Sequence, residues 1–179
     1  MTDDDYTSEA WGPYRKEGAV VSYDSRFDTL AHSRLVGELI GEIIHELIHR
    51  SYQHDLSKTL PPEVEVFDVV TPRLEKLTYG SEEYKASLEE MGDALLHHYA
   101  QNRHHPEHYD NGINDMTLVD LIEMLADWKA ATERHADGDL VKSLAIQRER
   151  FVIDSQLFKI LVNTALELRW IDEEPVITP

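Results

Sequence analysis

The sequence predicts an all-α protein, a single-domain helical bundle, and three observations lead to this fold class. Apolar residues recur three and four positions apart through several long segments, which is the spacing of one helix face. The sequence has no run of alternating polar and apolar residues long enough to indicate a strand, and no internal repeat. Its 179 residues suit one domain with a core of its own.

The first half of the chain is expected to contain three helices. Residues 1–27 have no sustained period and are expected to form an irregular N-terminal arm. A helix is expected over 28–53, where the apolar positions are 35, 36, 39, 40, 43, 44, 47 and 48. A shorter helix is expected from Pro62, in its first turn, to about residue 77. Ser81 is expected to cap a third helix over 82–104.

The second half begins where Pro106 disfavours a helical conformation of the residue before it. Thr117 is a typical cap for the helix that follows the next loop. The expected segments are a loop over 106–116, helices over 117–136, 139–151 and 155–170, and a mobile tail over 171–179. No linker interrupts residues 28–170, so we expect them to form one helical domain.

Composition excludes several classes of protein. The formal net charge of −18 argues against a nucleic-acid polymer as partner, because such proteins gain affinity from clustered Lys and Arg. Cysteine is absent, which excludes disulfides and thiolate metal sites. No apolar run is long enough to span a membrane, and the acidic N-terminus is unlike a signal peptide, so we expect no membrane association and a cytoplasmic location.

Residues 43–58, IIHELIHRSYQHDLSK, contain two metal-binding signals that compete. His45 and His49 match H-E-x-x-H, the helix of zinc proteases, whereas His54 and Asp55 form a bare His-Asp pair. On a helical wheel His45 and His49 fall opposite the apolar stripe, so we expect them to face water. His32 falls inside the stripe, which makes it either a satisfied core histidine or a metal ligand.

The helix expected over 117–136 carries one acidic stripe, formed by Asp120, Glu123 and Asp127. These residues are spaced i, i+3, i+7 and therefore lie on one face. One interpretation is the solvent-exposed face of an amphipathic helix. The other is that Asp127 completes a metal site, with Glu123 one turn away as a supporting residue or an acid/base.

The order His32, His54-Asp55, Asp127 resembles that of the HD superfamily of metal-dependent phosphohydrolases. The segments DTLAHSRLV, HDLSK, HHYAQNRHHPEHY and LIEMLADWKAATERH also resemble an uncharacterised family of HD-like proteins from bacterial and phage genomes, known only as a domain of unknown function. The resemblance covers about residues 28–170. It implies a helical bundle of HD-domain type in which His32, His54, Asp55 and Asp127 bind a divalent metal ion.

The His-rich segment ALLHHYAQNRHHPEHY raises the question of a second metal ion. His97 and His104 are two helical turns apart, and so are His98 and His105, so either pair could point at one place. Both pairs stay open as ligands of a second metal ion or as substrate-binding residues. Lys58 stands where mononuclear HD nucleotidases commonly have Glu, and this departure favours two ions.

The sequence therefore predicts an enzyme, a metal-dependent phosphohydrolase that acts on a small phosphate ester, with a nucleotide expected by family analogy. Lys58 and Glu123 are the catalytic candidates, and Lys58 and Arg103 are candidates for binding phosphate. One or two divalent ions are expected, from Mn, Mg, Co, Ni, Zn and Fe, and a homo-oligomer stays open. The alternatives are an HD-type di-iron oxygenase and a non-catalytic metal-binding interaction module.

Overall fold

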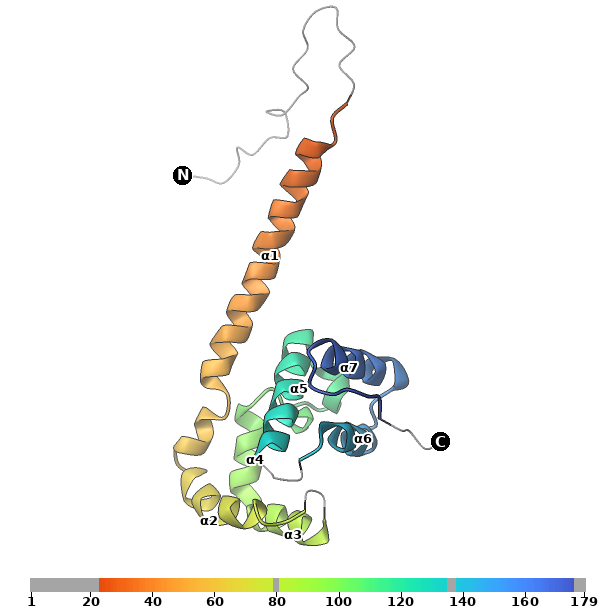
Figure 1. The fold of residues 1–179 in the computed structure, drawn as a ribbon. Helices are drawn as coiled ribbons and strands as arrows, with labels where there is room; N and C mark the ends of the chain where they lie inside the picture. Colours follow the sequence, from red (N-terminus) through yellow and green to blue (C-terminus); the bar gives the residue numbers. More distant parts are fainter. Residues whose placement is uncertain (1–22, 79–80, 135–137, 176–179) are drawn as a thin grey trace, which may run out of the picture. The chain divides into compact units, whose positions relative to one another are not determined.

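The computed structural model describes residues 23–78, 81–134 and 138–175. The chain divides into two compact units, residues 1–42 and 43–179, and each is described by itself. Within the described residues there are seven α-helices, short 3-10 helices and no strand, so the predicted all-α class is confirmed (Figure 1). None of the described helices combines the length and the apolar content that a membrane span needs.

The first helix, α1, spans Arg26–Gln53, close to its predicted bounds. The expectation that its apolar stripe faces a core is wrong for the described chain, because α1 contains no buried residue. In the second unit, Ile43, Ile44 and Ile48 are about half exposed. Helical spacing establishes that these side chains share a face, but their burial depends on whether another element covers that face.

A turn and two further helices follow α1. Asp55 has a φ of 57°, in the left-handed region that Asp adopts more readily than most residues. The 3-10 helix η2 (Leu56–Thr59) continues from it. The helix expected from Pro62 begins two residues later, as α2 (Val64–Leu74).

The helix predicted over 82–104 is two helices, α3 (Glu82–Glu90) and α4 (Gly92–Gln101). Ser81 caps α3 as predicted, with its hydroxyl accepting a hydrogen bond from the Tyr84 N–H. The break falls at Gly92, whose φ of +49° glycine adopts without steric penalty. Helix α4 ends at Gln101 because Asn102 is extended, so His104 and His105 lie beyond the helix.

The remaining helices lie near their predicted positions. The loop after α4 contains two short 3-10 helices, η3 (Pro106–His108) and η4 (Gly112–Asp115). The helices are α5 (Leu118–Glu133), α6 (Leu140–Arg150) and α7 (Ser155–Glu167). Thr117 caps α5 in a reciprocal capping box with Asp120, so the predicted cap is confirmed.

The hydrophobic core of the second unit is formed mainly by α5, α6 and α7, which lie together in Figure 1. Met124 and Leu144 are completely buried there, and the rings of Trp128 and Phe151 are parallel with centroids 6.2 Å apart. Ile171, in the expected tail, also packs into this core. The core fixes α5 and thereby positions the acidic side chains on that helix.

Candidate metal centre

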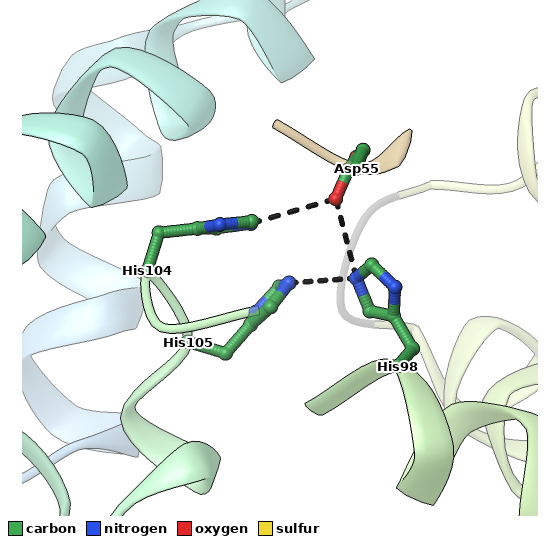
Figure 2. A group of neighbouring side chains, drawn as sticks. All are labelled: Asp55, His98, His104 and His105. Carbon is green, nitrogen blue, oxygen red and sulfur yellow. Dashed lines mark hydrogen bonds and ion pairs between the residues drawn. The ribbon is translucent and has the colours of Figure 1, made fainter. Parts of the chain in front are cut away.

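Asp55 is the centre of a cluster with three histidines, all within the second unit (Figure 2). Its Oδ1 lies 3.3 Å from His98 Nε2 and 3.6 Å from His104 Nε2. The Nε2 atoms of His98 and His105 are 2.9 Å apart. One ligand atom from each of the four residues lies within 4.8 Å of the others. This donor set of three imidazole nitrogens and one carboxylate suits a divalent transition metal or zinc.

A second group adjoins the first and consists of His54, His104 and Asp127. His54 Nε2 lies 3.5 Å from Asp127 Oδ1 and 3.7 Å from the second oxygen of Asp55. The two groups therefore share His104, and the carboxylate of Asp55 lies between them. This arrangement offers donor atoms for either one ion or two.

A buried carboxylate, that of Glu63, contacts the ring nitrogen of His98 that is not directed at the candidate site. Its side chain is fully buried and accepts hydrogen bonds from His98 Nδ1 at 2.9 Å, His97 Nδ1 at 2.7 Å and the Ser57 hydroxyl at 2.9 Å. Burial acts to raise the pKa of Glu63, but the hydrogen bonds from these residues outweigh it and the pKa is lowered. A carboxylate on one imidazole nitrogen commonly fixes the ring so that the other nitrogen can bind a metal.

Glu123 orients His54 and His104 in the same way. Its carboxylate lies 3.0 Å from His54 Nδ1 and 3.2 Å from His104 Nδ1, and it accepts a hydrogen bond from Arg50 at 3.1 Å. Burial acts to raise the pKa of Glu123, but the bonds from His104, His54 and Arg50 outweigh it and lower the pKa. Across the two groups, three histidines thus have Nδ1 on a carboxylate and Nε2 near the other candidate ligands, namely His54, His98 and His104.

Asp120 connects several segments around the candidate site through hydrogen bonds. It is fully buried and accepts hydrogen bonds from Arg50 at 2.5 Å, Tyr109 at 2.8 Å and the Thr117 backbone at 2.8 Å. Arg103 also bonds to it, with both contacts at 3.2 Å. These contacts join the start of α5 to Arg50, one turn before His54, and so tie the two parts of the site together.

Two atoms of the cluster are buried without a hydrogen-bond partner among the described residues, namely Asp55 Oδ1 and His104 Nε2. Buried polar atoms in native proteins are nearly always satisfied, so an unpaired oxygen facing an unpaired imidazole nitrogen indicates that a further group belongs between them. A cation bound by both would satisfy this need. The residues therefore fit a metal ion on geometry and on donor chemistry.

The protonation of the histidines differs between the two groups. Burial, together with the neighbouring His104 and His98, lowers the pKa of His105 to about 2, so its ring is neutral and able to bind a metal. Burial also lowers the pKa of His98. In contrast, hydrogen bonds with Asp127 and Glu123 raise the pKa of His54 to about 10, so a metal ion there must displace a proton.

Residues of both candidate groups line a cleft of about 1000 Å³ in the second unit. The site residues that line this cleft are His54, Asp55, His98, His105 and Asp127. Lys58 also lines it, with its ammonium 2.6 Å from Asp55 Oδ2 and 5.2 Å from the centre of the Phe67 ring. A ligand in the cleft can therefore reach the candidate metal ligands and a cation at once.

The structure brings together most of the residues that the sequence singled out. His54, Asp55 and Asp127 converge, and of the two histidine pairs it is His98, His104 and His105 that reach the site. His97 belongs to neither described group and contacts Glu63 instead. Arg103 is bonded to Asp120 and is not among the residues lining the cleft.

His45 and His49 are exposed on α1, and neither belongs to the candidate metal groups of the described chain. His32 is exposed on the part of α1 that lies in the first unit. The positions of the chain's parts relative to one another are not determined, so its role as a ligand stays a prediction.

Sequence reasoning missed Glu63, a single Glu after two prolines with no pattern around it. It also gave Glu123 a catalytic role, which stays a prediction, whereas the contacts of Glu123 are those of a residue that orients His54 and His104. The bond between Arg50 and Asp120 could not be found from spacing, because 70 residues separate them.

A family model matches residues 21–167, and its description is a family of unknown function (DUF5662). No curated protein shows significant similarity to the chain, and no solved structure does.

Proposed function

The chain belongs to the DUF5662 family of unknown function, and from its site we propose that it is a metal-dependent phosphohydrolase that acts on a small phosphate ester. The observation that carries this proposal is the convergence of Asp55, His98, His104 and His105, with an unpaired carboxylate oxygen facing an unpaired imidazole nitrogen. The order of His54, Asp55 and Asp127, which resembles that of HD phosphohydrolases, supports it.

A bound divalent ion supplies Lewis acidity, which draws charge from phosphoryl oxygens and makes water more acidic. The residues that would hold it are Asp55, His98, His104 and His105, with His54 and Asp127 available for a second ion. Glu63 and Glu123 keep the imidazole rings in the orientation that presents Nε2. The protein therefore holds the imidazole and carboxylate donors in fixed orientations beside the cleft.

Lys58 is the cation best placed to bind a phosphate. It lines the cleft next to Asp55, and its side chain is about one third exposed, so a ligand can reach it. When a phosphate oxygen approaches the ammonium, Lys58 acts as a point charge that holds the ester against the site. We expect Lys58→Met to raise KM, because the variant keeps the apolar stem and loses the charge.

The test is to purify the protein without chelator, measure its metal content and screen phosphate release with added Mn²⁺, Mg²⁺, Co²⁺, Ni²⁺ and Zn²⁺. We expect bound metal, phosphate release and loss of both in Asp55→Ala. His45→Ala and His49→Ala are controls on α1, the helix that precedes Asp55, and should keep both, since these side chains are exposed.

Two outcomes would refute the proposal in favour of its alternatives. Bound iron with oxygen consumption and no phosphate release would identify a di-iron oxygenase. Bound metal with no turnover of any ester would identify a non-catalytic metal-binding module. If the His45/His49 double variant loses its metal while Asp55→Ala keeps it, the site itself is misplaced.

A further inference from the structure

We propose that the substrate is a phosphate monoester of a bulky, mainly apolar or aromatic alcohol, and that compounds with additional phosphates are excluded. This inference rests on the proposed phosphohydrolase function and names the class of ester that the site accepts. Its basis is the part of the cleft beyond the candidate metal centre, where size, lining and charge all point to one kind of ligand.

The size of the cleft requires a large organic group. Its volume of about 1000 Å³ is at the upper end of the range of roughly 300–1000 Å³ for sites that bind drug-sized molecules. Since a water molecule occupies roughly 30 Å³, the cleft has room for about thirty of them, and a phosphate group with five heavy atoms would fill only one end. The rest of the space is available to the alcohol.

The walls of this space are largely apolar. Residues of α2, α3 and α4 line it together with residues of α5 and α6, so the lining comes from elements that lie far apart in the sequence. The apolar and aromatic residues are Phe67, Leu74, Leu77, Leu88, Met91, Leu95, Trp128, Ile146 and Phe151. Transfer of an apolar ligand from water to such a wall is favourable. A sugar or a second phosphate would lose its hydration there without new hydrogen bonds to replace it.

The charges of the cleft exclude additional phosphates. Every Lys and Arg among the described lining residues is already within 4 Å of a carboxylate. The pairs are Lys58 with Asp55, Arg134 with Glu75, Lys142 with Asp139 and Arg150 with Glu107. Asp68 adds a further negative charge to the lining. With Lys58 holding the first phosphate, a β- or γ-phosphate would meet only Arg134, Lys142 and Arg150 among the described lining cations, and each of these is paired with a carboxylate that repels it.

Two esters with matched leaving groups test this inference on the metal-loaded protein. Phenyl phosphate and biphenyl-4-yl phosphate release phenols of similar acidity and differ mainly in apolar bulk. We expect kcat/KM to be at least about tenfold higher for the biphenyl ester, a ratio within reach of apolar pockets. We expect inorganic pyrophosphate and ATP to be hydrolysed more slowly than either.

A pair of variants locates the effect in the cleft. Ile146→Asp places a charge on the apolar wall and should lower kcat/KM for the biphenyl ester far more than for phenyl phosphate, which removes the preference. Ile160→Asp is the matched control, because Ile160 is similarly exposed, at 50% against 41%, but does not line the cleft. Its preference should be unchanged.

The results separate this inference from the proposed function. Phosphate release with no preference for the biphenyl ester, or with a preference for pyrophosphate or ATP, would overturn the inference and leave the phosphohydrolase standing. No release from any compound, with biphenyl phosphate still binding more tightly than phenyl phosphate in calorimetry, would refute the reaction and support the ligand class. Neither release nor selective binding would overturn both.

Discussion

Replacing Glu63 by Gln tests whether the fully buried carboxylate positions His98 for a metal ion. The change keeps the shape of the side chain but turns an acceptor of three hydrogen bonds into a group that is half donor. His97 Nδ1, His98 Nδ1 and the Ser57 hydroxyl lie 2.7, 2.9 and 2.9 Å from the Glu63 carboxylate. The amide NH₂ of Gln only donates, so it cannot replace the carboxylate oxygen that accepts from these groups, and at least one contact is lost.

The expected effect is a loss of metal affinity that exceeds the loss of stability. Residues that hold a metal-binding histidine typically contribute 10-fold to 100-fold to affinity, which corresponds to about 1.4–2.8 kcal/mol. We therefore expect the Kd of the bound ion to rise by about that factor in Glu63→Gln. The measurement is a calorimetric titration of chelator-treated protein with Mn²⁺, repeated with Zn²⁺.

Two controls separate positioning from general damage. Glu65→Gln changes an exposed Glu on α2 and should leave the Kd unchanged. His97→Ala removes a Glu63 partner that belongs to neither candidate metal group, and should change the Kd by less than about threefold. An unaltered Kd in Glu63→Gln, with circular dichroism showing a native fold, would refute the positioning role.

Three further predictions concern stability and stoichiometry. Chelation should lower the melting temperature by several degrees, because the candidate ligands come from the turn after α1, from α4 and the segment that follows it, and from α5, and bound metal would tie these elements together; an unchanged melt after verified metal removal would contradict this. Combined replacement of His98 and His105 by Ala should reduce metal content by one ion per chain, measured by elemental analysis, and one ion in the saturated wild-type protein would exclude a two-metal site. Burial acts to raise the pKa of Asp120, but hydrogen bonds from Thr117, Arg50 and Tyr109 outweigh it and lower the pKa. This carboxylate therefore stabilises the fold above its unfolded pKa of about 3.9, and the stabilisation is lost as the pH falls through the folded value. Asp120→Asn should lower the free energy of unfolding, measured with urea at pH 7, by about 3 kcal/mol. It should also weaken the fall of this free energy at acid pH. An equally steep fall in the variant would show that other groups cause it.

Most helices could be predicted from the sequence because their signals are local. The period of apolar residues identified α1, and Thr117 as a cap identified the start of α5 within one residue. Where the local signal was weak, the prediction failed: one Gly inside an apparently continuous pattern did not reveal that α3 and α4 are separate, and nothing near Asn102 showed that α4 ends there.

The candidate site could be predicted only in part. His54, Asp55 and Asp127 were identified because their order resembles that of a known superfamily. This order indicates which residues could bind a metal but not how far apart they lie. The histidine pairs were chosen on helical spacing, whereas the end of α4 at Gln101 releases His104 and His105 from that spacing and lets both approach Asp55 with His98.

The sequence by itself determined most of the helices, the absence of thiolate ligands and the residue types available for a metal. The tertiary structure alone decided that Glu63 lies behind His98, that Arg50 reaches Asp120 and that the apolar face of α1 has no buried residue. The physical reason is range. A helix is specified by hydrogen bonds and caps between residues at most four positions apart, whereas the Glu63–His98 and Arg50–Asp120 contacts join residues that are 35 and 70 positions apart and exist only once the core has packed.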